Sequence, residues 1–306
     1  MYYTSALPTY DLNNKRVILR ADLNVPLDNG IIVDDYRLQA ILPTIDLILK
    51  KKGTITLLTH IGRPKKQEVL LSTKLLLDWF TQRNYTVSWA ATIDEALQLI
   101  NMPIKSILMV ENLRFYPEEK NQDLSFAKKL STLGDFYVND AFGALHRTDT
   151  SITALPTFFA PDHRTIGLLV EKELTTLAKL IDKPQKPFVI ILGGGKVKDK
   201  VPLIENFLHH SNTILLCPAI VTTFLKAIGQ EVGKSLVDET ALELCKSIIE
   251  KAKSRGIEIV FPTDYLIAHQ TIQGTREIVG AHNFPFHLLQ AEQIDAFLEQ
   301  RTRSQE

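Results

Sequence analysis

The sequence predicts an α/β protein with two doubly wound parallel-sheet domains joined by a helical hinge. Short runs of aliphatic and β-branched residues recur along the chain, and each is followed by a longer stretch with helical periodicity. The runs are almost wholly apolar instead of alternating, as expected for strands that are covered on both faces. Strands and helices that alternate along a chain form parallel sheets, so these observations define the fold class.

The expected strands lie at 16–20, 54–59, 85–89, 106–111, 135–139, 188–192, 213–217 and 257–261. The expected helices lie at 43–52, 72–83, 94–100, 123–132, 171–182, 200–211, 219–228, 239–255 and 288–302. Pro43 fits the first turn of its helix because its missing N–H would have no partner there. Ser72 and Asp123 are expected to cap the helices that follow them.

A helical run from Glu171 to Asp182, bounded by prolines, interrupts the alternation of strands and helices. Such a segment between two series of βα units is typical of an interdomain connection. We therefore expect an N-terminal domain at 1–165, a connecting helix and hinge at 166–187, and a C-terminal domain at 188–306. Because only three or four strands are expected after the hinge, the second sheet is predicted to be incomplete, with an exposed edge.

Charge balance and cysteine content exclude several classes of protein. The 306 residues carry 35 Lys and Arg against 35 Asp and Glu, which argues against a protein that binds nucleic acid through bulk charge. The two cysteines are too few for a disulfide scaffold and lack metal-ligand spacing. No signal peptide is recognised, and no apolar run is long enough for a membrane span. We therefore expect a cytoplasmic protein that binds neither nucleic acid nor membrane.

Arginines gather near the expected carboxyl ends of the first strands, where open α/β sheets bind their ligands. Clustered like charges cost energy unless an anion neutralises them, and the guanidinium fork matches phosphate and carboxylate groups. A single loop arginine is usually a solvated surface group, whereas four at one sheet edge predict a pocket for a small dianion. These residues are Arg37, Arg63, Arg114 and Arg147, accompanied by His60 and His146.

A glycine-rich segment, Gly193-Gly194-Gly195, follows the sixth expected strand and leads into a helix. A strand, such a turn and a helix start together can bind an anion through backbone N–H groups. The spacing is not that of a Walker A loop, and three glycines alone also fit a tight turn. Lys196, Lys198 and Lys200 favour a phosphate site, because a lysine can stabilise a phosphoryl group during transfer. Arginines that can bind one phosphate in the N-terminal half, and this turn that can bind another in the C-terminal half, together predict phosphoryl transfer.

Eight segments stand in the order found in the phosphoglycerate kinase family, and the resemblance extends from residue 10 to about 265. They are RADLNVPLDNG, DDYRLQAILPTI, THIGRPK, ENLRFYPEE, DFYVNDAFGALHRTDTS, ILGGGKVKDK, TFLKAIGQEVGKSL and IEIVFPTD. The resemblance implies two Rossmann-like domains in a monomer. It also implies reversible phosphoryl transfer in glycolysis between 1,3-bisphosphoglycerate and ADP, giving 3-phosphoglycerate and ATP, with Mg²⁺ accompanying the nucleotide.

The same resemblance assigns roles to residues of this chain. Arg37 and Lys196 would be catalytic, Arg37 by stabilising the transferring phosphoryl group and Lys196 by following it. The phosphoglycerate contacts would be Asp22, Leu23, Asn24, Arg37, His60, Ile61, Gly62, Arg63, Arg114 and Arg147. The nucleotide contacts would be Gly194, Gly195, Lys196 and Lys200. No protein ligand of a metal is assigned.

The C-terminal half departs from the family pattern. Pro218-Ala219-Ile220-Val221 stands where the family has a glycine-rich turn near the adenine, so bulkier side chains are expected to intrude there. The family's Asn-Gly-Pro and Gly-Gly-Asp turns have no counterpart, which predicts a shortened C-terminal domain. Three interpretations stay open: an active enzyme, an impaired relative that binds a phosphorylated carboxylic acid as a sensor or interaction protein, and a kinase with another phosphodonor.

Overall fold

The computed structural model describes residues 7–101, 103–182, 184–194, 197–232, 235–268 and 276–280. The chain divides into two compact units, Met1–Ala178 and Lys179–Glu306. Each unit has its own sheet and its own hydrophobic core. None of the helices in these described ranges is both long enough and apolar enough to cross a lipid bilayer.

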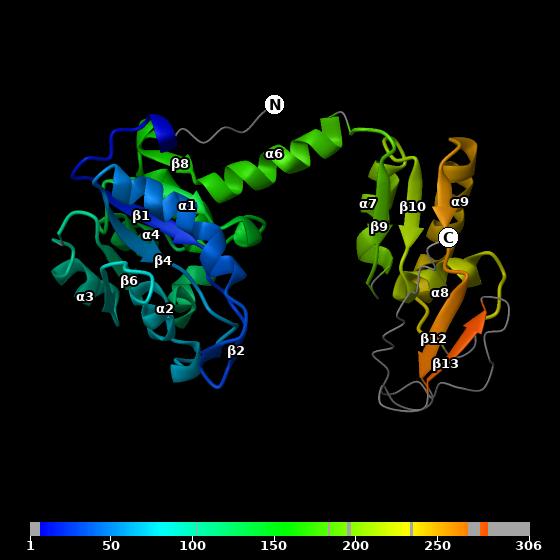
Figure 1. Ribbon diagram of the computed structural model, residues 1–306, viewed down its shortest axis with the longest axis horizontal. Coiled ribbons are helices and arrows are strands. Elements are labelled where there is room, and N and C mark those ends of the chain that lie inside the picture. The colour runs from blue at the N-terminus through cyan, green and yellow to red at the C-terminus, as the bar shows by residue number, and fades with distance from the viewer. Residues whose placement is uncertain are drawn as a thin grey trace. The chain divides into compact units, whose positions relative to one another are not determined.

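The first unit is built on a parallel six-stranded sheet with the order β5-β6-β4-β1-β7-β8. Figure 1 labels β1, β4, β6 and β8 of this sheet. Residue Val17 of the central strand β1 is aligned with Ile55 of β4 and with Phe136 of β7. The sequence predicts five of these strands, and all five are confirmed. The strands are β1 (Arg16–Ala21), β4 (Thr54–Leu58), β5 (Val87–Ala90), β6 (Ile107–Val110), β7 (Phe136–Asp140) and β8 (Arg164–Ile166).

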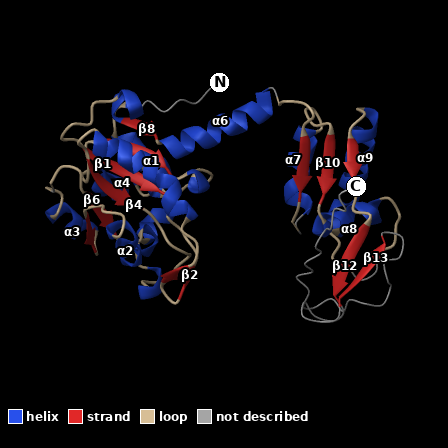
Figure 2. Cartoon of the chain, in the orientation of Figure 1, coloured by secondary structure: helices blue, strands red, loops and turns tan. Residues whose placement is uncertain are grey.

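Helices cover both faces of this sheet, and Figure 2 shows them around the strands. They are α1 (Tyr36–Lys50), α2 (Leu77–Thr81), α3 (Ile93–Gln98) and α4 (Leu124–Ser131). A short helix, α5 (Thr150–Thr153), follows η6 (Phe142–Ala144), and α6 (Leu168–Asp182) follows β8 and crosses the end of the first unit at Ala178. A two-stranded antiparallel hairpin, β2 (Leu27–Asp28) and β3 (Ile31–Ile32), precedes α1. Short 3₁₀ helices connect the larger elements: η1 (Leu7–Thr9), η2 (Val69–Leu71), η3 (Thr73–Leu76), η4 (Leu113–Phe115), η5 (Pro117–Lys120), η6 (Phe142–Ala144), η7 (Leu155–Phe158) and η8 (Pro161–His163).

Alternate strand residues enter separate cores on the two faces of the first sheet. Val17 and Leu19 pack in the core that α1 and α2 cover, whereas Ile18 packs in the core that α3 and α4 cover. The same division holds along β4, β6 and β7, where every residue is buried. The prediction of strands covered on both faces is therefore confirmed for these central strands.

The predicted start of the first long helix needs correction. Helix α1 begins at Tyr36, so Pro43 lies inside the helix and not in its first turn. An internal proline costs about 3 kcal/mol in an exposed helix, but Leu38, Ile41 and Ile45 of α1 are buried in the core, and this packing determines the helix.

Both predicted capping residues act as caps. The side chain of Asp123 accepts a hydrogen bond from the N–H of Phe126 at 2.7 Å, as predicted for α4. Ser72 caps as well, but the helix that it starts is the 3₁₀ helix η3, which leads into α2.

The second unit contains a parallel three-stranded sheet with the order β11-β10-β9. Its strands are β9 (Val189–Leu192), β10 (Thr213–Leu216) and β11 (Glu258–Val260), and its helices are α7 (Val197–Phe207), α8 (Pro218–Ala227), η9 (Glu239–Ala241) and α9 (Leu242–Ser254). A separate antiparallel hairpin joins β12 (Asp264–Ala268) to β13 (Arg276–Gly280). The helix predicted at 288–302 lies outside the described residues.

Strand β9 differs from the central strands of the first sheet. Ile190 and Leu192 are buried, whereas Val189 and Ile191 remain 46% and 69% exposed. The prediction of a strand covered on both faces is therefore wrong for β9. It lies at one end of the described three-stranded sheet and packs through a single face.

Candidate functional site

The loops that follow β6, β4, β1 and β7 form a continuous edge of the first sheet. These four strands are consecutive neighbours and all parallel, so their carboxyl ends meet at one side. The loops contain every residue predicted to bind phosphoglycerate except Arg37, which comes from the first turn of α1. We call these loops and the first turn of α1 the cationic edge.

Hydrogen bonds tie three of these loops together at Gly62. The N–H of Gly62 donates to Oδ1 of Asn24 at 2.7 Å, and its carbonyl accepts from the guanidinium of Arg114 at 2.5 Å. The N–H of Leu23 donates to the hydroxyl of Thr59 at 3.0 Å. Gly62 has a φ of +63°, which glycine adopts without strain. The structure therefore brings Leu23, Asn24, Gly62 and Arg114 together, as the sequence predicts.

Arg37 lies at the same edge and forms an ion pair with Asp22. The Arg37 side chain is 47% exposed, so one carboxylate occupies only part of its guanidinium. Gly143, in η6 after β7, packs directly against the Asp22 carboxylate, and a Cβ at this position would overlap Oδ2. The loops after β1 and β7 thus approach each other at a glycine that no larger residue can replace without displacing Asp22.

Arg114 and Arg147 share one carboxylate. Nε of Arg147 lies 3.2 Å from Oδ2 of Asp149, whereas the nearest guanidinium nitrogen of Arg114 lies 3.7 Å from the same oxygen. Nε and Nη2 of Arg114 are buried and have no hydrogen-bond partner among the described residues. Burial lowers the pKa of Arg114, and the charge of Arg147 lowers it further. An unpaired buried donor costs about 1–3 kcal/mol, so this guanidinium is under-satisfied in the protein alone.

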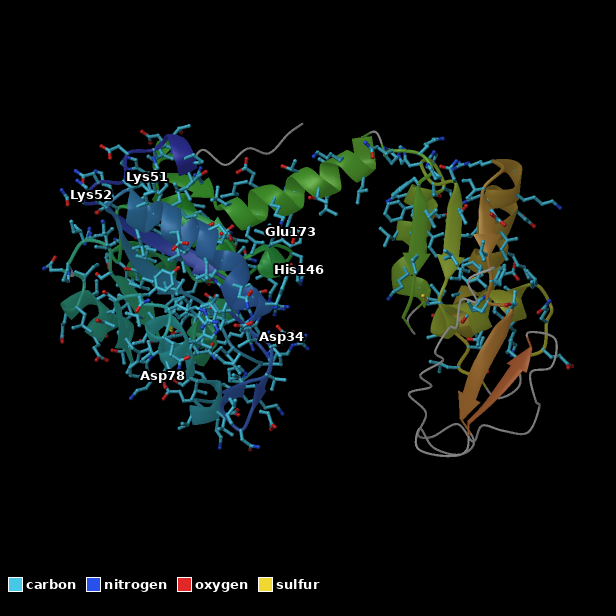
Figure 3. The ribbon with its side chains drawn as sticks, viewed as in Figure 1. Asp34, Lys51, Lys52, Asp78, His146 and Glu173 are labelled. Atoms are coloured by element: carbon cyan, nitrogen blue, oxygen red, sulfur yellow. The ribbon has the colours of Figure 1, made fainter. Side chains whose placement is uncertain are left out.

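Two residues that the sequence places at this edge are exposed. Arg63 follows Gly62 and has no ion pair with a described carboxylate. His146 is exposed as well, and in Figure 3 it lies on the same flank of the first unit as Asp34, which shortly precedes α1. Lys51 and Lys52 lie at the opposite end of α1, away from that flank (Figure 3). The lysine run after α1 is therefore no part of the cationic edge.

The sequence prediction missed a buried arginine beneath the edge. Arg20, in β1, is 0% exposed and contacts Nδ1 of His60 at 3.1 Å. Its Nε donates to the hydroxyl of Ser151 at 2.8 Å, and that hydroxyl donates to Oε1 of Glu119 at 2.5 Å. The signal in the sequence is a charge at the end of the apolar run RVILR, which a strand tolerates only with partners.

Positive charge exceeds negative charge at this edge. Burial, together with Arg20 and the neighbouring arginines, lowers the pKa of His60 to about 2, so the ring is neutral. Five guanidinium groups lie here, and in the described part of the chain three carboxylates pair with them directly or through Ser151. The cations are Arg20, Arg37, Arg63, Arg114 and Arg147, and the carboxylates are Asp22, Glu119 and Asp149. The guanidinium groups thus outnumber the carboxylates that pair with them by two.

The second unit contains part of the predicted nucleotide site. Gly194 follows β9 with a φ of +115°, and Nζ of Lys200 lies only 2.8 Å from where a Cβ of Gly194 would stand. Lys200 therefore lies against the turn. Gly195 and Lys196 lie outside the described residues, so Lys196, a predicted catalytic residue, is not placed.

The bulky residues that stand after β10, where the family has a glycine-rich turn, do not all point toward that turn as the sequence suggests. Ile220 and Val221 are fully buried in the core of the second unit, where they pack as part of α8. The expectation that these two side chains intrude at the turn is therefore wrong. Across the described ranges, no three His, Cys, Asp or Glu side chains are grouped closely enough to hold a metal ion.

The fold and the cationic edge define a doubly wound α/β protein with clustered arginines at the carboxyl edge of its first sheet. The family profile described as Phosphoglycerate kinase matches residues 7–293. A curated relative from Finegoldia magna, named phosphoglycerate kinase, is 38% identical over 90% of this chain and 71% of its own length. Another with that name, from Nostoc punctiforme, is 40% identical over 92% of this chain and 71% of its own.

Solved structures agree with the sequence comparison. The structure of phosphoglycerate kinase from Coxiella burnetii matches with a TM-score of 0.76 and 30% identity, over 89% of this chain and 70% of that one. The crystal structure from Pyrococcus horikoshii matches with a TM-score of 0.75. This chain belongs to the phosphoglycerate kinase family, and its resemblance to that family is confirmed.

Proposed function

We propose that this chain catalyses reversible phosphoryl transfer between 1,3-bisphosphoglycerate and ADP, giving 3-phosphoglycerate and ATP. Membership of the phosphoglycerate kinase family supports the reaction. The observation that carries the proposal is the surplus of guanidinium groups over paired carboxylates at the cationic edge. A three-carbon acid with a phosphate and a carboxylate carries roughly two and a half to three negative charges at pH 7 and would offset that surplus.

The proposed phosphoglycerate site uses groups that the protein leaves incompletely paired. Arg63 is exposed, and Arg37 has donors beyond the one directed at Asp22. Guanidinium forks bind phosphate and carboxylate oxygens in pairs, which gives both affinity and orientation. Asn24 and Arg114, held at Gly62, would keep the loops in place while the ligand binds.

The proposed nucleotide site lies in the second unit. An ammonium group over a glycine turn at a helix start suits the phosphates of ADP, and Lys200 with Gly194 provides this arrangement. Gly195 and Lys196 are included in the proposed nucleotide site because of the family match alone. Mg²⁺ usually binds nucleotide phosphates with few protein ligands and would neutralise their charge when bound.

The reaction needs alignment and charge compensation and no covalent intermediate with the protein. A terminal phosphate oxygen of ADP attacks the acyl phosphate, the bond from phosphorus to the carboxylate oxygen breaks, and 3-phosphoglycerate leaves as a carboxylate. Arg37 is proposed to stabilise the charge on the phosphoryl group in the transition state. The cationic edge orients the acyl phosphate throughout.

Calorimetry with 3-phosphoglycerate tests the binding site. Arg63→Ala should weaken binding by about 2 kcal/mol, or roughly thirtyfold, because it removes a charge-assisted contact from an exposed residue that supports no other group. Arg255→Ala makes the same change at an exposed position after α9 and should leave phosphoglycerate binding unchanged. Equal heats for the chain and Arg63→Ala would reject a phosphoglycerate site at the cationic edge.

A coupled assay with 1,3-bisphosphoglycerate and Mg-ADP tests the reaction itself. Formation of ATP by the chain supports phosphoryl transfer. Binding of 3-phosphoglycerate without ATP formation would reject the reaction and retain the site.

A further inference from the structure

We propose that Arg20, anchored by Ser151 and Glu119, is a positioning residue that fixes the ring of His60 as the neutral Nε2–H tautomer. The ring then presents a hydrogen-bond donor to the bound anion. The identity of that anion rests on the proposed function, but the state of the ring does not.

The guanidinium of Arg20 has a single orientation because each of its nitrogens has its own acceptor. Nε donates to the Ser151 hydroxyl at 2.8 Å, and Nη1 donates to the backbone carbonyl of Ala21. Nη2 faces Nδ1 of His60 at 3.1 Å. The side chain is 0% exposed, so no water competes for these donors.

The direction of the Arg20–His60 bond follows from the chemistry of the two groups. A guanidinium only donates hydrogen bonds and does not lose its proton in proteins. Nδ1 of His60 must therefore accept, which places the single ring proton of a neutral imidazole on Nε2. Among the described residues, no group of the protein is hydrogen-bonded to that Nε2, so this donor remains available to a ligand.

Ser151 and Glu119 hold Arg20 in place through a chain of hydrogen bonds. The Ser151 hydroxyl accepts from Arg20 and donates to Oε1 of Glu119 at 2.5 Å, while the backbone N–H of Ser151 donates to Oε2 at 3.0 Å. The buried Tyr137 hydroxyl donates to the carbonyl of Ser151 at 2.7 Å. Glu119 is fully buried and supplies the negative charge that a buried guanidinium requires.

A fixed tautomer matters because the ring lies among cations and would meet an anion. Burial and the charges of Arg20, Arg114, Arg147 and Arg37 disfavour a cationic ring, and among the described residues no carboxylate is hydrogen-bonded to it. With the proton on Nδ1, the ring would present a lone pair toward anionic oxygens. With the proton on Nε2, it donates to them.

Ring ¹⁵N spectra of the full, ligand-free chain test the tautomer directly. The sequence has eight histidines, and the variant His60→Gln assigns the resonances of His60 by their loss. The proposal requires an unprotonated Nδ1 and a protonated Nε2 that stay unchanged from pH 5 to pH 8. A cationic ring, or a proton on Nδ1, in the unmodified chain would overturn it.

Variants test the role of Arg20 and its anchor. Arg20→Met removes the donor, and the His60 spectrum should change to a mixture of both tautomers. Arg20→Lys retains a charged donor and should restore the Nε2–H form at least in part. Ser151→Ala is the milder variant and should shift the same resonances in the same direction, so the test survives if Arg20→Met fails to fold.

Matched substitutions away from the network serve as controls. Arg16→Met changes an arginine at the other end of β1, where Asp135 is its partner. Ser131→Ala changes a half-buried serine at the end of α4. Both should leave the His60 spectrum as in the unmodified chain, and unchanged His60 spectra in Arg20→Met and Ser151→Ala would overturn the proposal.

Phosphoglycerate titration separates this inference from the proposed function. Arg20→Met should weaken binding by about tenfold or more, because a donor to a charged ligand is lost for part of the time. If the unmodified chain shows the Nε2–H ring but binds no phosphoglycerate, the proposed function fails and the positioning role stands. If it binds phosphoglycerate with the proton on Nδ1, the positioning role fails and the function stands.

Discussion

Replacing Asp140 by asparagine should stabilise the first unit at neutral pH. Asp140 ends β7, and its buried carboxylate meets the start of α6, where Oδ1 accepts from the N–H of Val170 at 2.9 Å. Oδ2 accepts from the hydroxyl of Thr44 at 2.5 Å, and that hydroxyl accepts from the N–H of Leu168 at 3.0 Å. Burial raises the pKa of Asp140 from 3.8 to about 6 despite these hydrogen bonds.

The size of the effect follows from that shift. A rise of about two pKa units corresponds to about 3 kcal/mol of differential stability. The folded state holds the proton more tightly than the unfolded state, so the favourable contribution is complete below pH 4 and is lost as pH rises to about 6. Asparagine does not ionise and escapes this cost. The asparagine amide donates to the Thr44 hydroxyl, which loses the carboxylate oxygen that accepted its own hydrogen bond. This loss reduces the gain in stability by about 1 kcal/mol. The expected net gain at pH 7 is therefore about 2 kcal/mol.

Urea unfolding followed by tryptophan fluorescence measures this change in the first unit alone. The two tryptophans of the sequence, Trp79 and Trp89, both belong to the first unit. Asp140→Asn should be more stable than the unmodified chain at pH 7 and less stable, by about 1 kcal/mol, at pH 4.

The control is Asp123→Asn, the same change at the half-buried cap of α4, which should alter stability by about 1 kcal/mol or less. A loss of stability at pH 7 in Asp140→Asn would refute the reasoning. It would show that the capping bonds of the carboxylate outweigh its desolvation.

Two further substitutions probe the packing around the cationic edge. Gly143→Ala should displace Asp22 and with it Arg37, weakening phosphoglycerate binding about tenfold by calorimetry and lowering stability by about 1–3 kcal/mol; unchanged affinity would contradict the close approach of the two loops. Tyr137→Phe should cost about 1–2 kcal/mol in tryptophan-detected unfolding, because the buried carbonyl of Ser151 loses its donor. Tyr85→Phe, which removes a hydroxyl paired with the exposed Asp46, is the matched control and should cost about 0.5 kcal/mol or less. Equal losses in the two tyrosine variants would contradict the difference in burial.

Apolar runs located the strands well because burial on two faces leaves a continuous signal. Strand β8 escaped prediction because it spans only Arg164–Ile166, contains a charge, and follows Pro161. The start of α1 was misplaced because Pro43 is a strong local marker of a helix start. In the protein, the tertiary packing of Leu38 and Ile41 overrides that marker.

Arg63, Arg114 and Arg147 could be predicted because each lies in a loop that follows a strand of the first sheet. The groups beneath them could not be predicted in the same way. Glu119 lies in the short 3₁₀ segment Pro117–Lys120 and resembles an ordinary surface acid, and Ser151 gives no pattern of its own. Their roles arise from contacts over 32 residues with each other and over 131 residues with Arg20, and local sequence does not encode such distances.

The backbone of Gly62 links three loops, namely its own loop after β4 and the loops after β1 and β6. Its N–H binds the loop after β1 through Asn24, and its carbonyl binds the loop after β6 through Arg114. A disturbance in either loop therefore reaches the other through a single residue, and substitutions at Asn24 and Arg114 should combine non-additively. The guanidinium groups on these loops would then already hold fixed positions when a ligand binds, so little conformational entropy of the loops would be lost on binding.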